Sequence, residues 1–158
     1  MALSDYPYYN PYAIEGEEIS STFEGRHVNI LESDLVHIDL TGDGLVQKGQ
    51  PVSFGIGWAG AGVGIALQTA GAATAHIPVD TEGIWRCEVN SEFGMIVGQI
   101  VFITSAGVLV DWPPDPECHI FGYMLQPLDA GVGIRAVKVH WMDTGIWWWW
   151  FWWWEQPK

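Results

Sequence analysis

One stretch of the sequence gathers residue types that could bind a metal ion. His37, Asp39 and Asp43 lie close together in HIDLTGD, and carboxylate oxygens are the ligands that hard divalent cations prefer. The spacing is not that of an EF-hand loop. An Asp in a turn such as TGDG ordinarily accepts hydrogen bonds from its own backbone. The pattern therefore predicts a turn in preference to a metal site.

No other combination of residues predicts catalysis or cofactor binding. The sequence GAGVG at residues 60–64 lacks the G-x-G-x-x-G spacing and the following helix of a dinucleotide site, and is typical of tight turns between strands. No G-x-S-x-G nucleophile motif occurs, although a triad can be assembled from distant residues. The other histidines are scattered: His27, His76, His119 and His140. We expect no enzyme activity, no cofactor and no bound metal.

The composition indicates one protein domain with a core and excludes several partners. Hydrophobic residues make up 49% of the 158 residues, and the net charge is −13, which repels phosphate backbones and argues against nucleic-acid binding. Cys87 and Cys118 stand alone, so two buried thiols are expected, with no disulfide or metal site. The first residues do not resemble a signal peptide, and no apolar run reaches the length of a membrane-spanning helix.

The middle of the chain, residues 26–141, has the pattern of short strands between glycine turns. In residues 84–89, Trp85, Cys87 and Val89 alternate with more polar positions. Runs rich in Val, Ile and aromatic residues predict strands within residues 35–40, 51–58, 63–67, 75–79, 84–89, 95–104, 108–112, 119–125 and 134–141. This pattern predicts an all-β fold, a small barrel or sandwich.

Residues 1–25 form a separate zone, which we expect to be an extended arm. Pro7 and Pro11 favour extended backbone, and the stretch EGEEISSTFEG has room for one helical turn. Tyrosines are effective contact residues because they combine a large area with few rotors and a polar tip. The residues expected to contact a neighbouring protein are Tyr6, Tyr8, Tyr9 and Tyr12.

Residues 142–158 form a third zone, a tryptophan-rich tail that ends GIWWWWFWWWEQPK. Its eight consecutive rings are Trp147, Trp148, Trp149, Trp150, Phe151, Trp152, Trp153 and Trp154. Burying eight such rings removes on the order of 1,600 Å² from water, so the tail needs an apolar partner. Contact between subunits around a three-fold axis is the first expectation, an apolar pocket on another protein the second, and a membrane or glycan the third.

Residues 47–140 contain a series of short motifs in a recognisable order. The series begins with GQPV (49–52), VGIAL (63–67) and IPVDTEGIW (77–85), and continues with GQIVF (98–102), GVLV (107–110) and GYMLQPLDAGVGIRAVKV (122–139). In this order the chain resembles the small decoration, or cement, proteins of tailed-phage capsids. The arm and the tail lie outside the resemblance.

The resemblance implies a compact β domain that forms a homotrimer on the outer surface of an icosahedral virion. Such proteins have no catalytic activity; they assemble in the host cytoplasm and clamp neighbouring copies of the major capsid protein. The alternative is a surface adhesin whose Trp-rich tail contacts a membrane interface or a glycan. Against a membrane, the tail is flanked by Asp143 and Glu155, with Lys158 as its one cation. A small β-barrel enzyme is the third and weakest interpretation.

Overall fold

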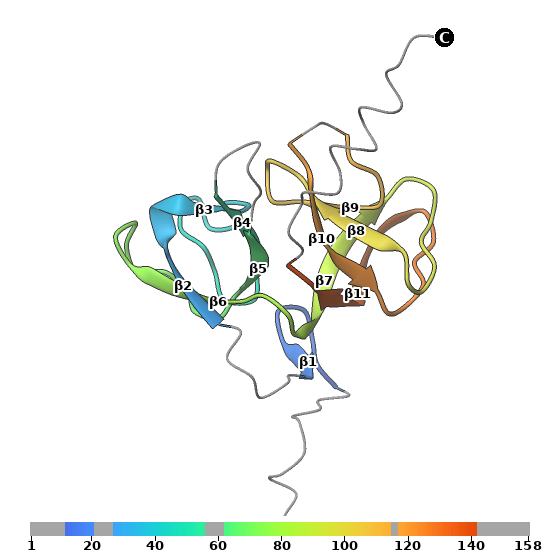
Figure 1. The fold of residues 1–158 in the computed structure, drawn as a ribbon, viewed down its shortest axis with the longest axis horizontal. Helices are drawn as coiled ribbons and strands as arrows, with labels where there is room; N and C mark the ends of the chain where they lie inside the picture. The colour runs from blue at the N-terminus through green and yellow to red at the C-terminus, as the bar shows by residue number, and fades with distance from the viewer. Residues whose placement is uncertain (1–11, 21–26, 56–61, 115–116, 142–158) are drawn as a thin grey trace, which may run out of the picture.

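The computed structural model describes residues 12–20, 27–55, 62–114 and 117–141. Strands dominate these residues, so the predicted all-β fold with a small barrel is confirmed (Figure 1). The strands are β1 (Glu18–Ser20), β2 (His27–Leu31), β3 (Leu35–Val36), β4 (Pro51–Phe54), β5 (Gly62–Ala66), β6 (His76–Asp80), β7 (Ile84–Ser91), β8 (Ile100–Ile103), β9 (Leu109–Val110), β10 (His119–Met124) and β11 (Gly131–Val139). A short 3₁₀ turn, η2 (Glu32–Asp34), separates β2 from β3.

The strands β7 to β11 close into a barrel. The pairing order is β7–β11–β10–β8–β9, and β9 returns to β7 through a parallel pairing of Asn90 with Val110. All the other pairings in the barrel are antiparallel. Since β11 pairs along almost the whole of β7, both β1 and β9 must use the opposite edge of β7. The strand β1 pairs with the beginning of β7, near Ile84, and β9 pairs with β7 near the end of that strand.

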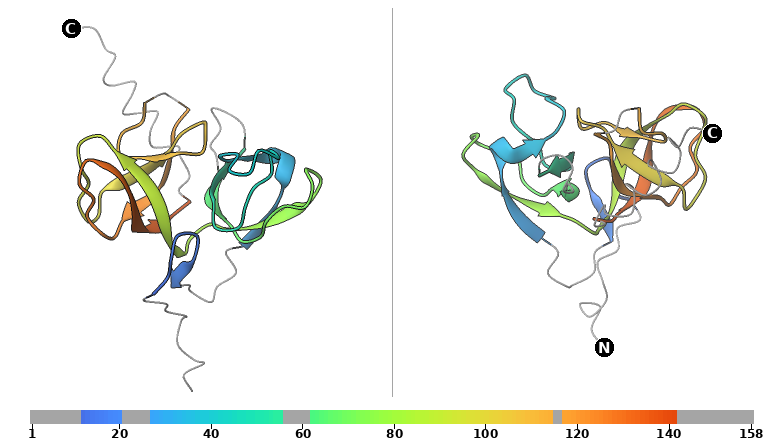
Figure 2. Two further views of the ribbon diagram at one scale, coloured as in Figure 1. Left: turned by 180° about the vertical axis from the view of Figure 1, so that it is seen from behind. Right: turned by 45° about the horizontal axis from the view of Figure 1, so that its top comes forward.

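The strands β2 to β6 form a second, open sheet beside the barrel. Its order is β2–β6–β5–β4–β3, and every pairing is antiparallel. Figure 1 shows this sheet to the left of the barrel, and the two halves also lie side by side in both views of Figure 2. The chain crosses from the sheet to the barrel once along the described residues, in the turn between β6 and β7.

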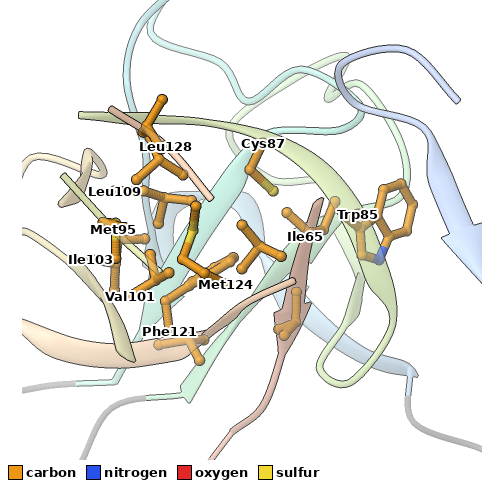
Figure 3. Packing of buried hydrophobic residues seen from close by; sticks show 14 residues of the cluster. Ile65, Trp85, Cys87, Met95, Val101, Ile103, Leu109, Phe121, Met124 and Leu128 are labelled. Atoms are coloured by element: carbon orange, nitrogen blue, oxygen red, sulfur yellow. The ribbon is translucent and has the colours of Figure 1, made fainter. Parts of the chain in front are cut away.

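The strand β5 is buried on both faces, and it joins the hydrophobic cores of the two halves. Val63 and Ile65 belong to the barrel core, while Ala66 belongs to the core of the sheet. Figure 3 shows Ile65 in the same cluster of side chains as Trp85 and Met124. The packing of alternate residues onto opposite sides is the ordinary consequence of the two-residue period of a strand.

The face of β5 that points into the hydrophobic core of the sheet carries only small residues. A Cβ atom built on Gly62 would lie 2.1 Å from the ring of Phe54, and one built on Gly64 would lie 2.4 Å from Val79 Cγ1 and 2.5 Å from the carbonyl oxygen of Asp80. These distances are far shorter than van der Waals contact. Both glycines are therefore needed for the ring of Phe54 and the residues of β6 to pack this closely against β5.

Several predicted strands are confirmed with small changes in their ends. The alternation predicted for residues 84–89 is present, with Trp85, Cys87 and Val89 buried. The strands expected within residues 35–40 and 95–104 are shorter in the structure, where they cover only Leu35–Val36 and Ile100–Ile103. In both runs the apolar residues outside the strand lie in loops, where they do not alternate between two faces.

The described part of the predicted arm differs from the expectation. The helical turn suggested for EGEEISSTFEG is wrong at Glu18–Ser20, which is the strand β1. Before it, Ala13 is buried against Ala136 and Ile84, and the N–H of Gly16 donates to the carbonyl oxygen of Arg86. Residues 13–20 therefore pack against the barrel of their own chain.

The tight packing around β5 yields a stability prediction. Gly64→Ala places a methyl group against backbone and side-chain atoms of β6, and overpacking of this kind costs about 1–3 kcal/mol. The control is Gly71→Ala, because Gly71 is exposed and a Cβ there meets nothing within 4 Å. Urea unfolding is expected to show the loss for the first variant and a change within about 0.5 kcal/mol for the second. Equal stability of the two variants would contradict the packing described for β5.

Candidate interaction surface

Of the predicted contact residues, Tyr12 is the one that the structure describes, and its side chain is 88% exposed. The other predicted contact residues lie outside the described residues: Tyr6, Tyr8, Tyr9, Trp147, Trp148, Trp149, Trp150, Phe151, Trp152, Trp153 and Trp154. The expectation that these residues contact neighbouring proteins stays a prediction. The described part of the chain carries a candidate interaction surface of its own.

Such a surface lies on the loops at one end of the barrel. Three of its residues are in the connection from β7 to β8, and the fourth follows β9. Their exposed fractions are 76% for Phe93, 72% for Ile96, 58% for Val97 and 67% for Trp112. We call these four residues the barrel-end surface. Single exposed apolar residues are common, but a group of large ones marks a contact site.

A buried carboxylate holds two parts of the barrel-end surface together. Asp111 Oδ2 accepts hydrogen bonds from the hydroxyl of Ser91 at 2.7 Å and from the N–H of Phe93 at 3.1 Å. The Ser91 hydroxyl oxygen in turn accepts the N–H of Gly94. Since Trp112 follows Asp111 directly, this network fixes the backbones of both aromatic residues. It also reinforces the point where β9 closes the barrel onto β7.

The aliphatic part of the surface lies on a tight turn. The N–H of Gln99 donates to the carbonyl oxygen of Ile96, and the side-chain oxygen of Gln99 accepts the N–H of Ile96 at 3.2 Å. Gly98 has a φ of +86°, the left-handed conformation that glycine adopts without strain. Its N–H donates to the carbonyl oxygen of Met124. The turn is thus fastened to β10, and it points Ile96 and Val97 outward.

Hydrogen bonding keeps Asp111 ionised at neutral pH. Burial raises the pKa of Asp111. The hydrogen bonds from the Ser91 hydroxyl and from the backbone N–H groups of Phe93 and Glu92 together lower the pKa by more than burial raises it, so it lies below the ordinary value. The folded state therefore favours the carboxylate more than the unfolded state does. The stability gained from Asp111 is complete above the ordinary pKa, near 3.9, and is lost as the pH falls through the lowered pKa.

Two acidic residues flank the barrel-end surface. Glu92 precedes Phe93 and is exposed. Asp129 is also exposed, and it follows Leu128, whose backbone pairs with that of Met95 in the same loop. The surface thus combines an apolar centre with hydrogen-bond acceptors at its border.

The last described residues are fixed at the other end of the barrel. The N–H of Val139 donates to the carbonyl oxygen of Gly83, and the N–H of Trp141 donates to that of Thr81. The ring of Trp141 contacts that of Phe54 edge to face, with a centroid distance of 5.5 Å. The Trp-rich tail therefore begins at the junction between the sheet and the barrel.

The turn at this junction is organised by a second buried carboxylate. Asp80 accepts the indole N–H of Trp85 at 2.9 Å and the backbone N–H groups of Glu82 and Gly83 at 3.0 and 3.1 Å. Asp80 and Trp85 are both 3% exposed. Because every bond runs between β6, the turn and β7, this network sets the direction in which the chain enters the barrel.

The residues first considered as metal ligands serve the loop that contains them. Asp39 accepts the N–H of Gly42 at 2.7 Å, and Asp43 accepts the hydroxyl of Thr41 and the N–H of Leu45. These bonds confirm the predicted turn. The ring of His37 instead lies 3.0 Å from a carboxylate oxygen of the buried Glu32, which also accepts the N–H of Val46. Within the described residues, no group of three or more His, Cys, Asp or Glu could hold a metal ion.

The two cysteines differ in their environment. Cys87 lies in the barrel core, where burial raises the pKa of its thiol. The prediction that both thiols are buried is wrong for Cys118, which is only partly buried because it follows an exposed loop. The two cysteines are not joined in a disulfide.

Comparison with known proteins adds no relationship, since no family model and no curated protein matches the chain. In the portion of the chain described by the structure, no helix is long and apolar enough to cross a membrane. The barrel-end surface is therefore the feature that bears on function. The sequence pattern does not predict this surface, because the apolar run MIVGQIVFIT at residues 95–104 is typical of one strand. The glycines at 94 and 98 beside Phe93, Ile96 and Val97 were the available signal for a loop.

The Asp111 network predicts a pH-dependent loss of stability. Asp111→Asn removes the charge that Ser91 and Phe93 stabilise, and we expect it to cost about 1–3 kcal/mol at pH 7. Below about pH 4 the wild-type chain loses this contribution too, so the difference between the two proteins narrows. Urea unfolding at pH 7 and pH 3 measures both effects. Glu88→Gln serves as the control at an exposed acid, and a pH-independent difference for Asp111→Asn would contradict the assignment.

Proposed function

We propose that this chain is a structural virion protein that decorates and stabilises an icosahedral phage capsid as a homotrimer. The observation that carries the proposal is the barrel-end surface: large apolar side chains displayed on loops that are fastened to a rigid barrel. A surface of this kind is built for contact with another protein. The proposal excludes catalysis and needs no cofactor.

The motifs that resemble decoration proteins support the proposal through their places in the fold. GQPV leads into β4, VGIAL covers all of β5 after its first residue, and IPVDTEGIW includes the Asp80–Trp85 network. GQIVF ends in β8, and the longest motif runs from β10 to β11. The motifs thus lie on the strands and turns that fix this architecture, in both halves of the molecule. They support a shared fold more directly than a shared binding surface.

The size of the surface favours an assembly with many joint contacts. Two aromatic and two aliphatic side chains, all more than half exposed, offer roughly 500 Å². A stable interface between two proteins usually buries about 800 Å² on each partner. One such contact alone is therefore weak, whereas a symmetric trimer seated on a shell makes several contacts act together.

The direct test is to add the purified chain to phage capsids that lack their decoration protein. We expect native mass spectrometry to give the mass of a trimer, and electron microscopy of the capsids to show added density at three-fold and pseudo-three-fold positions. Liposomes of neutral and anionic lipid are the control surface. A monomer that leaves capsids bare would overturn the proposal, and a monomer that binds liposomes would favour the adhesin.

Deleting residues 1–12 is expected to weaken attachment to capsids without unfolding the domain. The deletion ends before Ala13, the residue at which the described buried contacts of this region begin. Capsid occupancy is measured by gel densitometry, and retained folding by circular dichroism and thermal melting. Unchanged occupancy would mean that the arm makes no contribution to attachment.

Truncation after Ile146 is expected to lower the melting temperature of the trimer or its occupancy on capsids. The tail carries eight rings that need apolar partners, and the proposal places them mainly between chains. Thermal melting and native mass of the truncated chain test this expectation. If the truncated chain trimerises and decorates as well as the full chain, the tail acts outside the particle.

A further inference from the structure

We propose that the barrel-end surface of one copy is the binding site for the Trp-rich tail, residues 147–154, of a second copy. This inference rests on the self-association in the proposed function, and it names the two surfaces that meet. The occupant is a segment of the chain itself. Three features of the structure support this pairing: the chemistry of the surface, the place where the tail begins, and the areas involved.

The chemistry of the barrel-end surface matches that of tryptophan. An indole ring is apolar over most of its area and has a single polar group, an N–H that donates but never accepts a hydrogen bond. The apolar centre of the surface suits the rings, and the carboxylates of Glu92 and Asp129 at its border can accept indole N–H groups. The chain already contains one such pair, since Asp80 accepts the indole N–H of Trp85 at 2.9 Å.

The position of Trp141 favours a neighbouring copy as the source of the tail. Trp141 is bound to Thr81, before the beginning of β7, whereas the barrel-end surface lies just beyond the end of β7. The eight residues of β7 separate the two places by roughly 23 Å. The five residues 142–146 span at most about 18 Å even when fully extended. Within one chain Trp147 and Trp148 would therefore be used up in crossing this distance, and only the later rings would reach the surface.

The areas also require more than one surface for each tail. The eight rings need on the order of 1,600 Å² of cover, and the barrel-end surface offers roughly 500 Å². A tail that reaches from its own junction to the barrel end of a neighbour contacts two chains along its length. In a closed ring of copies, every tail and every barrel-end surface then has a partner.

The test separates the tail from the surface by using two variants. The first, Ile96→Ser with Val97→Ser in the full chain, removes two exposed side chains and leaves the backbone hydrogen bonds of the turn in place. The second is the chain truncated after Ile146, which keeps the surface and lacks the tail. The matched control is Leu40→Ser, because Leu40 is 64% exposed and lies outside the barrel. Circular dichroism and thermal melting check that each variant folds.

Analytical ultracentrifugation then measures self-association. We expect the dissociation constant to rise at least tenfold for the surface variant and to stay within twofold of wild type for Leu40→Ser. Mixing the surface variant with the truncated chain should restore a 1:1 complex, because one supplies the tail and the other an intact surface.

A surface variant that associates as tightly as wild type would overturn the inference and leave the proposed trimer standing. A monomeric wild-type chain would overturn both. If the truncated chain does not fold, the comparison of the surface variant with Leu40→Ser decides the matter.

Discussion

The strand β5 packs on both faces, and the rest of the molecule depends on this double contact. One face contributes Val63 and Ile65 to the barrel core, and the other is so closely approached that Gly62 and Gly64 leave no room for a Cβ atom. A sheet of five strands beside a barrel of five strands would otherwise be two small cores, each with little apolar area to bury. Sharing one strand lets both halves close over the same buried backbone, so neither half is complete without the other.

The shared strand sets where the chain can cross between the halves, and this in turn sets the two ends of the barrel. Asp80 pairs with Ile65 of β5 and directs the turn into β7, while the last residues of β11 bind the same turn. The tail therefore starts where the halves meet. At the far end of β7, Asp111 holds the loops that display Phe93 and Trp112. The two features that need partners are thus held apart by the length of the barrel.

Local patterns in the sequence predicted the parts of the fold that depend on local contacts. The alternation around Trp85 and the turn at Asp39 and Asp43 follow from a two-residue period and from short side-chain-to-backbone bonds. Barrel closure could not be predicted in this way, because it rests on a single parallel pair and on a carboxylate twenty residues from its hydroxyl partner. The same holds for β5, whose sequence shows an alternation of small and large residues but not which core each side enters.

The barrel-end surface escaped prediction for a related reason: its apolar residues look like a strand. In a strand, Ile96 and Val97 would point to opposite faces, and one of them would be buried. The glycine turn places both outside, at 72% and 58% exposure, where the chain itself gains nothing from their hydrophobicity. A net charge of −13 opposes close approach of any two copies, so association needs a strong local attraction that acts at short range. Apolar burial supplies it, because its strength depends on area and is not screened by salt. Long-range repulsion therefore limits unspecific association, and the exposed apolar side chains attract only where two surfaces come into direct contact.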